Sequence, residues 1–360
     1  MSETYIIAEA GINHNGSLDL ALELVEAAKQ SGADSVKFQT FKAEDVVSKF
    51  APQCDYQVVN TQKLESQLDM VRRWQLSLAD FKKIKDRCLK LGIEFLSTPF
   101  DMGSIDLLAN DLGVSRLKLP SGEITNAPYL IKSAQSGLPL VVSTGMSTLD
   151  EVRHALEAIA FGLVESPKSS KGPSKESFTN AFQSDEGQRL LRERVTLLHC
   201  TTDYPAPLKD VNLRAMITMR DHFHLPTGYS DHTQGIVVPI AAVAMGASII
   251  EKHFTLDRKM TGPDHAASLE PNELRDMVKA IRDVDVAMGS TEKRPALSEQ
   301  KNKAIVRKSL IAIKDIRAGE VFSENNLGVK RPGNGISPFE YWSYLGRVAE
   351  RNFTEDELIQ

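Results

Sequence analysis

The strongest constraint on this chain is a regular alternation of short apolar or β-branched runs with longer amphipathic stretches between residues 5 and 288. This alternation is typical of strand–helix units that build a parallel sheet. The amphipathic stretches 18–32 and 77–92 each end at a glycine, which suits a helix C-cap. The predicted strands are residues 5–9, 35–39, 93–97, 115–119, 139–143, 195–200, 227–230 and 248–254.

Eight such units in a little under 300 residues predict an α/β fold of the (β/α)8 TIM-barrel type, with an open doubly wound sheet as the alternative. We expect the barrel to span residues 1–288. It is interrupted at about 163–190 by a segment rich in Ser, Lys, Gly and Pro, which is typical of a surface loop. A linker at 289–306 and a small β-rich domain at 307–360 complete the predicted organisation.

Composition excludes several classes of protein. With 41% hydrophobic and 25% charged residues, the 360-residue chain can form a core and is neither disordered nor fibrous. No apolar run approaches the roughly 20 residues of a membrane helix. A net charge of -5 disfavours nucleic acid as a partner, and three scattered cysteines without a secretory signal favour the cytoplasm.

Polar side chains recur at the C-terminal ends of the predicted strands. Strands of a parallel barrel are buried on both faces, so a charge there is costly unless it is paired or used. Barrel active sites lie at this end of the strands. The residues concerned are Glu9, Lys37, Gln39, Thr98, Lys118, Ser121, Glu123, Ser143, His199, Ser230, His232, Glu251 and His253.

Lys37 and Lys118 interrupt otherwise apolar runs. Two lysines at a common mouth predict a site for a small, multiply charged anion. In the alternative interpretation, each lysine forms a structural ion pair with a carboxylate such as Glu9 or Glu123. Hydroxyl groups would complete a cradle for phosphate and carboxylate, namely those of Thr98, Ser121, Ser143 and Ser230.

His232 and His253 end neighbouring predicted strands and could bind one divalent ion, Mn²⁺, Mg²⁺ or Co²⁺, together with water and substrate oxygens. Ordinary hydrogen-bonded histidines are the alternative, and His14, His199 and His265 compete for the metal role. The chain contains no P-loop, no dinucleotide-binding glycine motif, no nucleophile elbow and no HExxH. Nucleotide hydrolysis, dinucleotide redox and serine hydrolase chemistry are therefore disfavoured.

The ordered motifs AEAGINHNG, SVKFQTF, FLSTPFD, LKLPSGE, STGM, LLHCTTDYPAP, GYSDHT, IEKHFT, GPDHAASLEP and VKRPGNGISP resemble one family. That family comprises the N-acetylneuraminate (sialic acid) synthases and their bacterial relatives that make legionaminic and pseudaminic acids. The resemblance implies condensation of phosphoenolpyruvate (PEP) with the open-chain aldehyde of an N-acylated amino sugar. The leading hypothesis is an N-acetylneuraminate synthase using N-acetylmannosamine. The alternative is an N,N'-diacetyllegionaminate synthase using 2,4-diacetamido-2,4,6-trideoxymannose.

The resemblance also assigns roles. It implies a divalent metal, with Mn²⁺ favoured, on His232 and His253. It implies that Lys37 and Lys118 act on PEP, with Glu9 or Glu123 handling the proton of the attacking water. Substrate contacts are implied for Gln39, Thr98, Ser121, Ser143, Thr202, Tyr204, Ser230 and Asp264.

Residues 307–360 resemble the antifreeze-like (SAF) domain of the same family. The resemblance implies a domain-swapped homodimer in which Arg331 reaches the sugar's N-acyl group in the neighbouring subunit. We expect residues 55–70 to carry sugar selectivity, with Asn60 as a candidate contact. Two other classes remain as alternatives: an ice-binding protein, suggested by the small domain, and a metal-dependent barrel hydrolase that acts without PEP.

Overall fold

The computed structural model describes residues 3–53, 58, 65–165 and 172–360. It contains two compact units, Met1–Gly289 and Ser290–Gln360. Asn60 lies outside the described residues.

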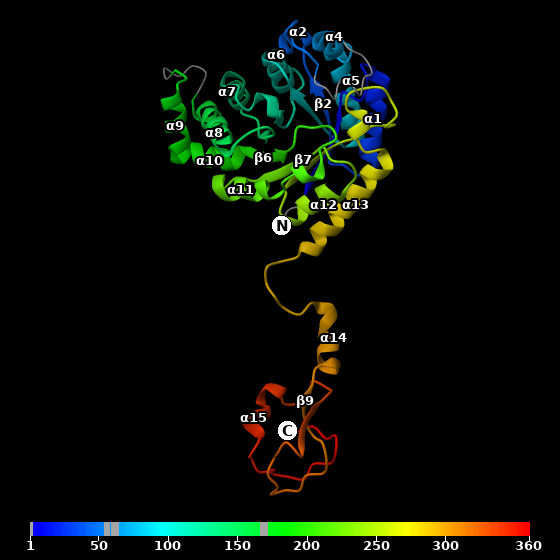
Figure 1. The fold of residues 1–360 in the computed structure, drawn as a ribbon, viewed down its shortest axis with the longest axis vertical. Helices are drawn as coiled ribbons and strands as arrows, with labels where there is room; N and C mark the ends of the chain where they lie inside the picture. Colours follow the sequence, from blue (N-terminus) through cyan, green and yellow to red (C-terminus); the bar gives the residue numbers. More distant parts are fainter. Residues whose placement is uncertain (1–2, 54–57, 59–64, 166–171) are drawn as a thin grey trace. The chain divides into compact units, whose positions relative to one another are not determined.

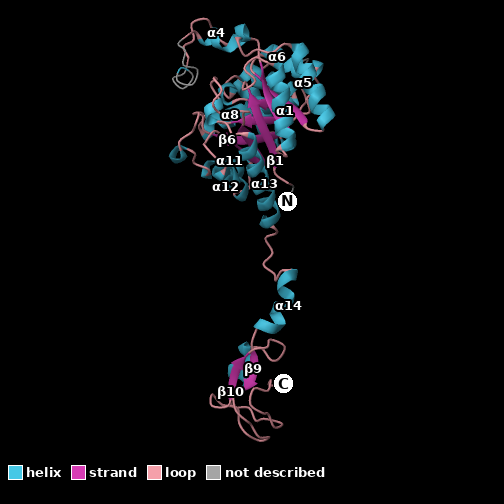
Figure 2. Cartoon of the chain, turned by 90° about the vertical axis from the view of Figure 1, so that its right-hand side faces the viewer, coloured by secondary structure: helices cyan, strands magenta, loops and turns pink. Residues whose placement is uncertain are grey.

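The first unit is an eight-stranded parallel barrel, as predicted (Figures 1 and 2). The strand order is β3-β2-β1-β8-β7-β6-β5-β4, and the two end strands, β3 and β4, are in contact. The strands are β1 (Tyr5–Gly11), β2 (Ser35–Thr40), β3 (Glu94–Pro99), β4 (Leu117–Leu119), β5 (Leu140–Ser143), β6 (Val195–Cys200), β7 (Thr227–Asp231) and β8 (Ile249–His253).

Helices surround this barrel, and their apolar faces pack on its outer surface (Figure 2). Local sequence sets their ends: Ser77 caps α5 in a capping box with Asp80, and Gly92 ends it in the left-handed conformation. In the described part of the chain, no helix is both long and apolar enough to span a membrane. The helices of this unit are α1 (Leu18–Gln30), α2 (Ala43–Val46), α4 (Gln67–Arg72), α5 (Leu78–Leu91), α6 (Met102–Asp106), α7 (Ala127–Gln135), α8 (Leu149–Val164), α9 (Lys175–Gln183), α10 (Asp185–Arg194), α11 (Arg214–Phe223), α12 (Val237–Ala244) and α13 (Pro271–Met288).

The barrel interior is layered. An apolar layer consists of Ile7, Leu96, Val141, Leu198 and Ile249. Two residues further along four of these strands the inward position is polar, because alternate residues of a strand share a face. These polar positions are Glu9, Thr98, Ser143 and Glu251. The apolar layer therefore fills the middle of the barrel, and the polar layer lies above it at the C-terminal end of the strands.

The segment expected to be a surface loop is partly helical, which corrects that expectation. Ser174 caps α9 through Ser177, and Phe178 of α9 packs on Phe161 of α8 with ring centroids 5.2 Å apart. Ala181 is buried on the same helix. These apolar side chains, spaced three residues apart, give a Ser- and Lys-rich segment a face that can pack.

The second unit has its own small core, formed by Leu310, Ala312, Ile316, Phe322, Leu327, Ala349, Phe353 and Ile359. An antiparallel pair, β9 (Ser309–Ala312) and β10 (Leu327–Lys330), and the short helix α15 (Tyr341–Tyr344) belong to it. The predicted linker contains a helix, α14 (Leu297–Val306). At its start the backbone N–H of Ala296 donates a hydrogen bond to the Glu299 carboxylate.

Candidate active site at the C-terminal end of the barrel

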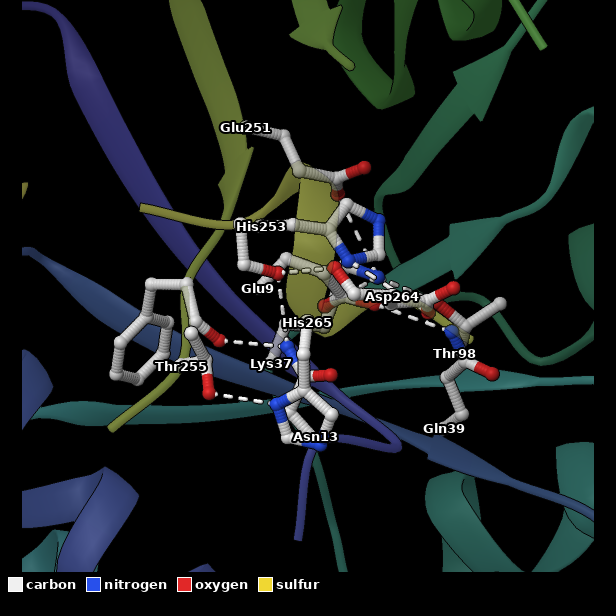
Figure 3. A network of polar contacts seen from close by, with 12 residues as sticks. Glu9, Asn13, Lys37, Gln39, Thr98, Glu251, His253, Thr255, Asp264 and His265 are labelled. Carbon is white, nitrogen blue, oxygen red and sulfur yellow. Dashed lines mark hydrogen bonds and ion pairs between the residues drawn. The ribbon is translucent and has the colours of Figure 1, made fainter. Parts of the chain in front are cut away.

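A buried ion-pair network occupies the polar layer. Lys37 Nζ lies 2.8 Å from Glu9 Oε2 and 3.5 Å from Glu251 Oε2, and it donates a 2.8 Å hydrogen bond to Thr98 Oγ1. Figure 3 shows these side chains converging. The strand register explains the convergence, because Glu9 stands opposite Lys37 on one side and His253 on the other.

Glu251 connects the second lysine to this network. Its Oε1 lies 3.2 Å from Lys118 Nζ and accepts a 2.7 Å hydrogen bond from Ser230 Oγ. The side chains of Glu9, Lys37, Lys118 and Glu251 are only 2–6% exposed. Such burial is tolerable only because the charges are paired. The ion-pair interpretation is therefore correct in its contacts, with Glu251 rather than Glu123 as the second carboxylate.

The two carboxyl groups differ in acidity. Burial, opposed by Lys37 and assisted by Glu251, raises the pKa of Glu9 to about 7. Burial also acts to raise the pKa of Glu251, but the charges of Lys118 and Lys37 outweigh it and hold that pKa below its usual value. Glu9 can therefore exchange a proton near neutral pH, whereas Glu251 remains an anion.

The network lines a cavity of about 240 Å³. Ser143 Oγ, which also lines it, is buried and has no hydrogen-bond partner among the described residues, so it is available to a ligand oxygen. Most of the predicted site residues surround this cavity: Glu9, Lys37, Gln39, Thr98, Lys118, Ser121, Ser143, Thr202, Tyr204, Ser230, His232 and His253.

His232 and His253 lie together on the cavity wall, with ring centroids 5.4 Å apart. His232 Nδ1 donates to the Thr201 carbonyl oxygen at 2.6 Å, which leaves Nε2 as the lone-pair nitrogen. His253 Nδ1 is buried and has no hydrogen-bond partner in the described structure. Burial lowers the pKa of both rings. Neutral imidazoles with unengaged nitrogens suit a divalent ion.

The histidine pair would supply two metal ligands. In the described ranges, no group of three or more His, Cys, Asp and Glu side chains is arranged to hold a metal, so water and substrate would complete the coordination. The competing histidines do not line the cavity. His199 Nε2 lies 2.7 Å from the Val211 carbonyl oxygen, His265 Nδ1 lies 2.7 Å from Thr255 Oγ1, and His14 Nδ1 accepts from the Gly16 amide.

A second ion pair fixes the backbone behind the two histidines. Asp231 and Lys252 stand opposite each other on β7 and β8, with Lys252 Nζ 2.6 Å from Asp231 Oδ2 and both side chains fully buried. Lys252 also donates to the Thr233 carbonyl oxygen. Asp231 precedes His232 and Lys252 precedes His253. The pair therefore holds the two metal-ligand candidates in one register.

Three predicted site residues lie outside the cavity. Glu123 Oε2 accepts a 2.6 Å hydrogen bond from Asn126. Asp264 is buried beside an adjoining cavity, 3.8 Å from His253 Nδ1, and burial raises its pKa to about 6. Arg331 is an exposed residue of the second unit.

Sequence reasoning noted Glu251 as a strand-end residue but did not place it in the site. The signal was available, because Glu251 and His253 are two residues apart on one strand and so share a face. The cavity residues Phe100, Met146 and Cys200 were also missed. An apolar residue at a strand end looks like core in a sequence.

Comparison with known proteins identifies relatives of the whole chain. Residues 24–293 match the NeuB family and residues 307–360 match the SAF domain. The N,N'-diacetyllegionaminic acid synthase of Campylobacter jejuni is 50% identical over 360 residues, which is 100% of both chains. That of Legionella pneumophila is 46% identical and covers 97% of this chain and 91% of its own. The N-acetylneuraminic acid (sialic acid) synthetase of Leptospira borgpetersenii, solved with citrate, has a TM-score of 0.67 at 32% identity and covers 84% of this chain and 90% of its own.

These relatives correct the leading expectation of an N-acetylneuraminate synthase. The two legionaminic acid synthases are 50% and 46% identical over nearly the whole chain, whereas the sialic acid synthetase is 32% identical. The motifs behind that expectation lie largely on and after the barrel strands. They report the chemistry of the shared site and carry little information about the sugar.

We predict that Glu251→Gln destabilises the first unit by on the order of 3 kcal/mol, because it leaves Lys118 without its carboxylate partner in a buried position. Urea unfolding followed by circular dichroism would measure the effect. Glu193→Gln is the matched control, since Glu193 pairs with Arg189 at half-exposed positions on α10. Its cost should stay below about 1 kcal/mol. Equal stability of the two variants would contradict the role assigned to the network.

Proposed function

The chain belongs to the NeuB family, and from this premise we propose that it is an N,N'-diacetyllegionaminic acid synthase. In the proposed reaction, C3 of PEP attacks the aldehyde carbon of open-chain 2,4-diacetamido-2,4,6-trideoxymannose. Water adds at C2 of PEP, and phosphate leaves. The observation that carries the proposal is full-length identity of 50% to a synthase of that product.

The lysine pair supports a PEP site in the cavity. Lys37 and Lys118 would neutralise the carboxylate and phosphate of PEP, and Ser143 offers an unengaged buried hydroxyl to one of their oxygens. Thr98 and Ser230 already bond to the network, so they would hold the lysine and carboxylate side chains in place as the anion enters.

The two histidines fit a divalent ion, for which we propose Mn²⁺, with Mg²⁺ or Co²⁺ as substitutes. Lewis-acid polarisation of the aldehyde oxygen is the chemistry that such an ion supplies. His232 and His253 would bind it through the nitrogens that their surroundings leave unengaged. The neighbouring Lys252–Asp231 pair joins the two strand ends that carry these histidines.

Glu9 is the carboxyl group best suited to handle the proton of the attacking water. It lines the cavity, and its pKa of about 7 lets it accept and return a proton near neutral pH. Glu123 is engaged with Asn126 away from the cavity. We therefore assign the proton transfer to Glu9 and an electrostatic role to Glu251.

The proposed function predicts a preference between two acceptors. Phosphate release from PEP with Mn²⁺ should be faster, judged by kcat/KM, with 2,4-diacetamido-2,4,6-trideoxymannose than with N-acetylmannosamine, by about ten-fold or more. Controls without acceptor, and with EDTA, should show no release. Preference for N-acetylmannosamine, or release without any acceptor, would refute the proposal.

We predict that His232→Ala and His253→Ala each lower Mn²⁺-dependent turnover by more than about 100-fold, because each removes half of the protein's ligands. Equilibrium Mn²⁺ binding, followed by electron paramagnetic resonance of free Mn²⁺, should weaken in parallel. His222→Ala, at an exposed position on α11, is the control for loss of an imidazole. Normal Mn²⁺ binding by either site variant would remove the two-histidine site.

We also propose a domain-swapped homodimer in which Arg331 of one subunit contacts the acceptor's N-acyl group in the other. Arg331→Ala should then raise KM for the acceptor more than KM for PEP, by about ten-fold. Arg317→Ala, an exposed arginine of the same unit, should change neither constant. An unchanged acceptor KM in Arg331→Ala would exclude this contact.

A further inference from the structure

The ion-pair network lines the cavity described above, which we call the charged cavity. A second cavity of about 240 Å³ adjoins it. The two share Gln39, Phe100, Tyr204 and His253 as a common wall. A ligand whose reactive end lies at the histidine pair is therefore next to the second cavity.

The lining of this second cavity is mainly apolar. Ile12, Phe41, Met70 and Trp74 form a hydrophobic cluster of their own, separate from the barrel core, and each is at most 9% exposed. Val71 and Phe100 pack against that cluster. We call this space the apolar cavity. Its lining differs from that of the charged cavity, which contains two lysines and two glutamates.

The apolar cavity is built by segments that follow β1 and β2, at the same end of the barrel as the ion-pair network. Ile12 directly follows β1, Phe41 directly follows β2, and Met70 and Val71 belong to α4. Gly16 allows the close approach of these segments, because a Cβ at that position would collide with the Arg73 carbonyl oxygen. Backbone packing therefore fixes the loop after β1 against the end of α4.

A minority of the residues that line this space are polar. Gln39, Tyr204 and His253 stand on the wall shared with the charged cavity, and Asp264 stands beside Gln39 and His253 (Figure 3). Gln67 lines it from α4, the helix that also carries Met70 and Val71. Asp264 is 7% exposed, and Gln39 Nε2 donates a 3.4 Å hydrogen bond to Glu9 Oε1. An amide N–H of a ligand could be met by the Asp264 carboxyl group. Hydroxyl groups in the rest of the cavity would meet mainly apolar side chains, with Gln67 as the polar exception.

The two acceptors differ in the groups they would place there. The diacetamido sugar ends in a C6 methyl group and carries an acetamido group at C4, whereas N-acetylmannosamine has hydroxyl groups at both positions. An apolar wall gains from burying methyl groups, and it penalises hydroxyl groups that lose their hydrogen bonds to water.

We propose that the apolar cavity receives the C4–C6 end of the acceptor and that Met70 and Val71 determine specificity for the 6-deoxy, 4-acetamido sugar. This assignment rests on the proposed function and deepens it. It places the discrimination between the two sugars on α4, away from the residues that hold PEP.

The test is a filling variant, Val71→Phe, at a half-buried position that can accept a larger side chain. It should lower kcat/KM for the diacetamido sugar about ten-fold or more, through KM for the acceptor, and leave KM for PEP unchanged. It should affect N-acetylmannosamine less, because a hydroxyl group at C4 needs less room. Val71→Thr, which keeps the size but adds a hydroxyl group, should shift the preference several-fold towards N-acetylmannosamine.

Val286→Phe is the matched control, at a position on α13 that is 84% exposed. It should leave both acceptors unchanged, and thermal unfolding of all three variants should confirm that they fold. If the wild type prefers the diacetamido sugar but Val71→Phe affects both acceptors equally or neither, the apolar cavity is not the specificity site and the proposed function stands. If the wild type prefers N-acetylmannosamine, the proposed function fails and this inference with it.

Discussion

Four buried charges set the conditions for the rest of this barrel. Glu9, Lys37, Lys118 and Glu251 come from four strands and lie within ion-pair distance at the level where the apolar interior ends. Any one of them alone would be strongly destabilising at such depth. The network therefore requires β1, β2, β4 and β8 to be present in their native register. Fold and site are thus parts of one electrostatic arrangement.

The strands could be predicted from the sequence because their apolar and β-branched runs are short and well separated. Because alternate residues of a strand share a face, the sequence also predicts that Lys37 lies on one face with Gln39, Ser230 with His232, and Glu251 with His253. This alternation does not predict which residues of different strands lie opposite each other. Which carboxylate meets Lys118 depends on the register of distant strands, and this is why Glu123 was expected where Glu251 is found.

Other features were hidden for a different reason. Met70 ends the stretch 55–70 that we expected to carry sugar selectivity, but Trp74 is an apolar residue that suits an ordinary core, and only the fold reveals that both border a cavity at the end of the barrel that carries the site. Helix α9 was hidden by the serines and lysines of the segment that contains it, although Phe178 and Ala181 share its buried face. In both cases the residue types of a segment did not predict its surroundings in the folded chain.

The pairing of both lysines in the free protein has a kinetic consequence. The lysines and glutamates that line the charged cavity have formal charges that sum to zero, and the whole chain carries -5. Before a divalent ion binds, these four charges therefore exert little long-range pull on an approaching anion. The anion must instead bind at lysines that already have carboxylate partners. Recognition thus depends on contacts made at short range, where the spacing of the ligand's charges must match that of the two lysines.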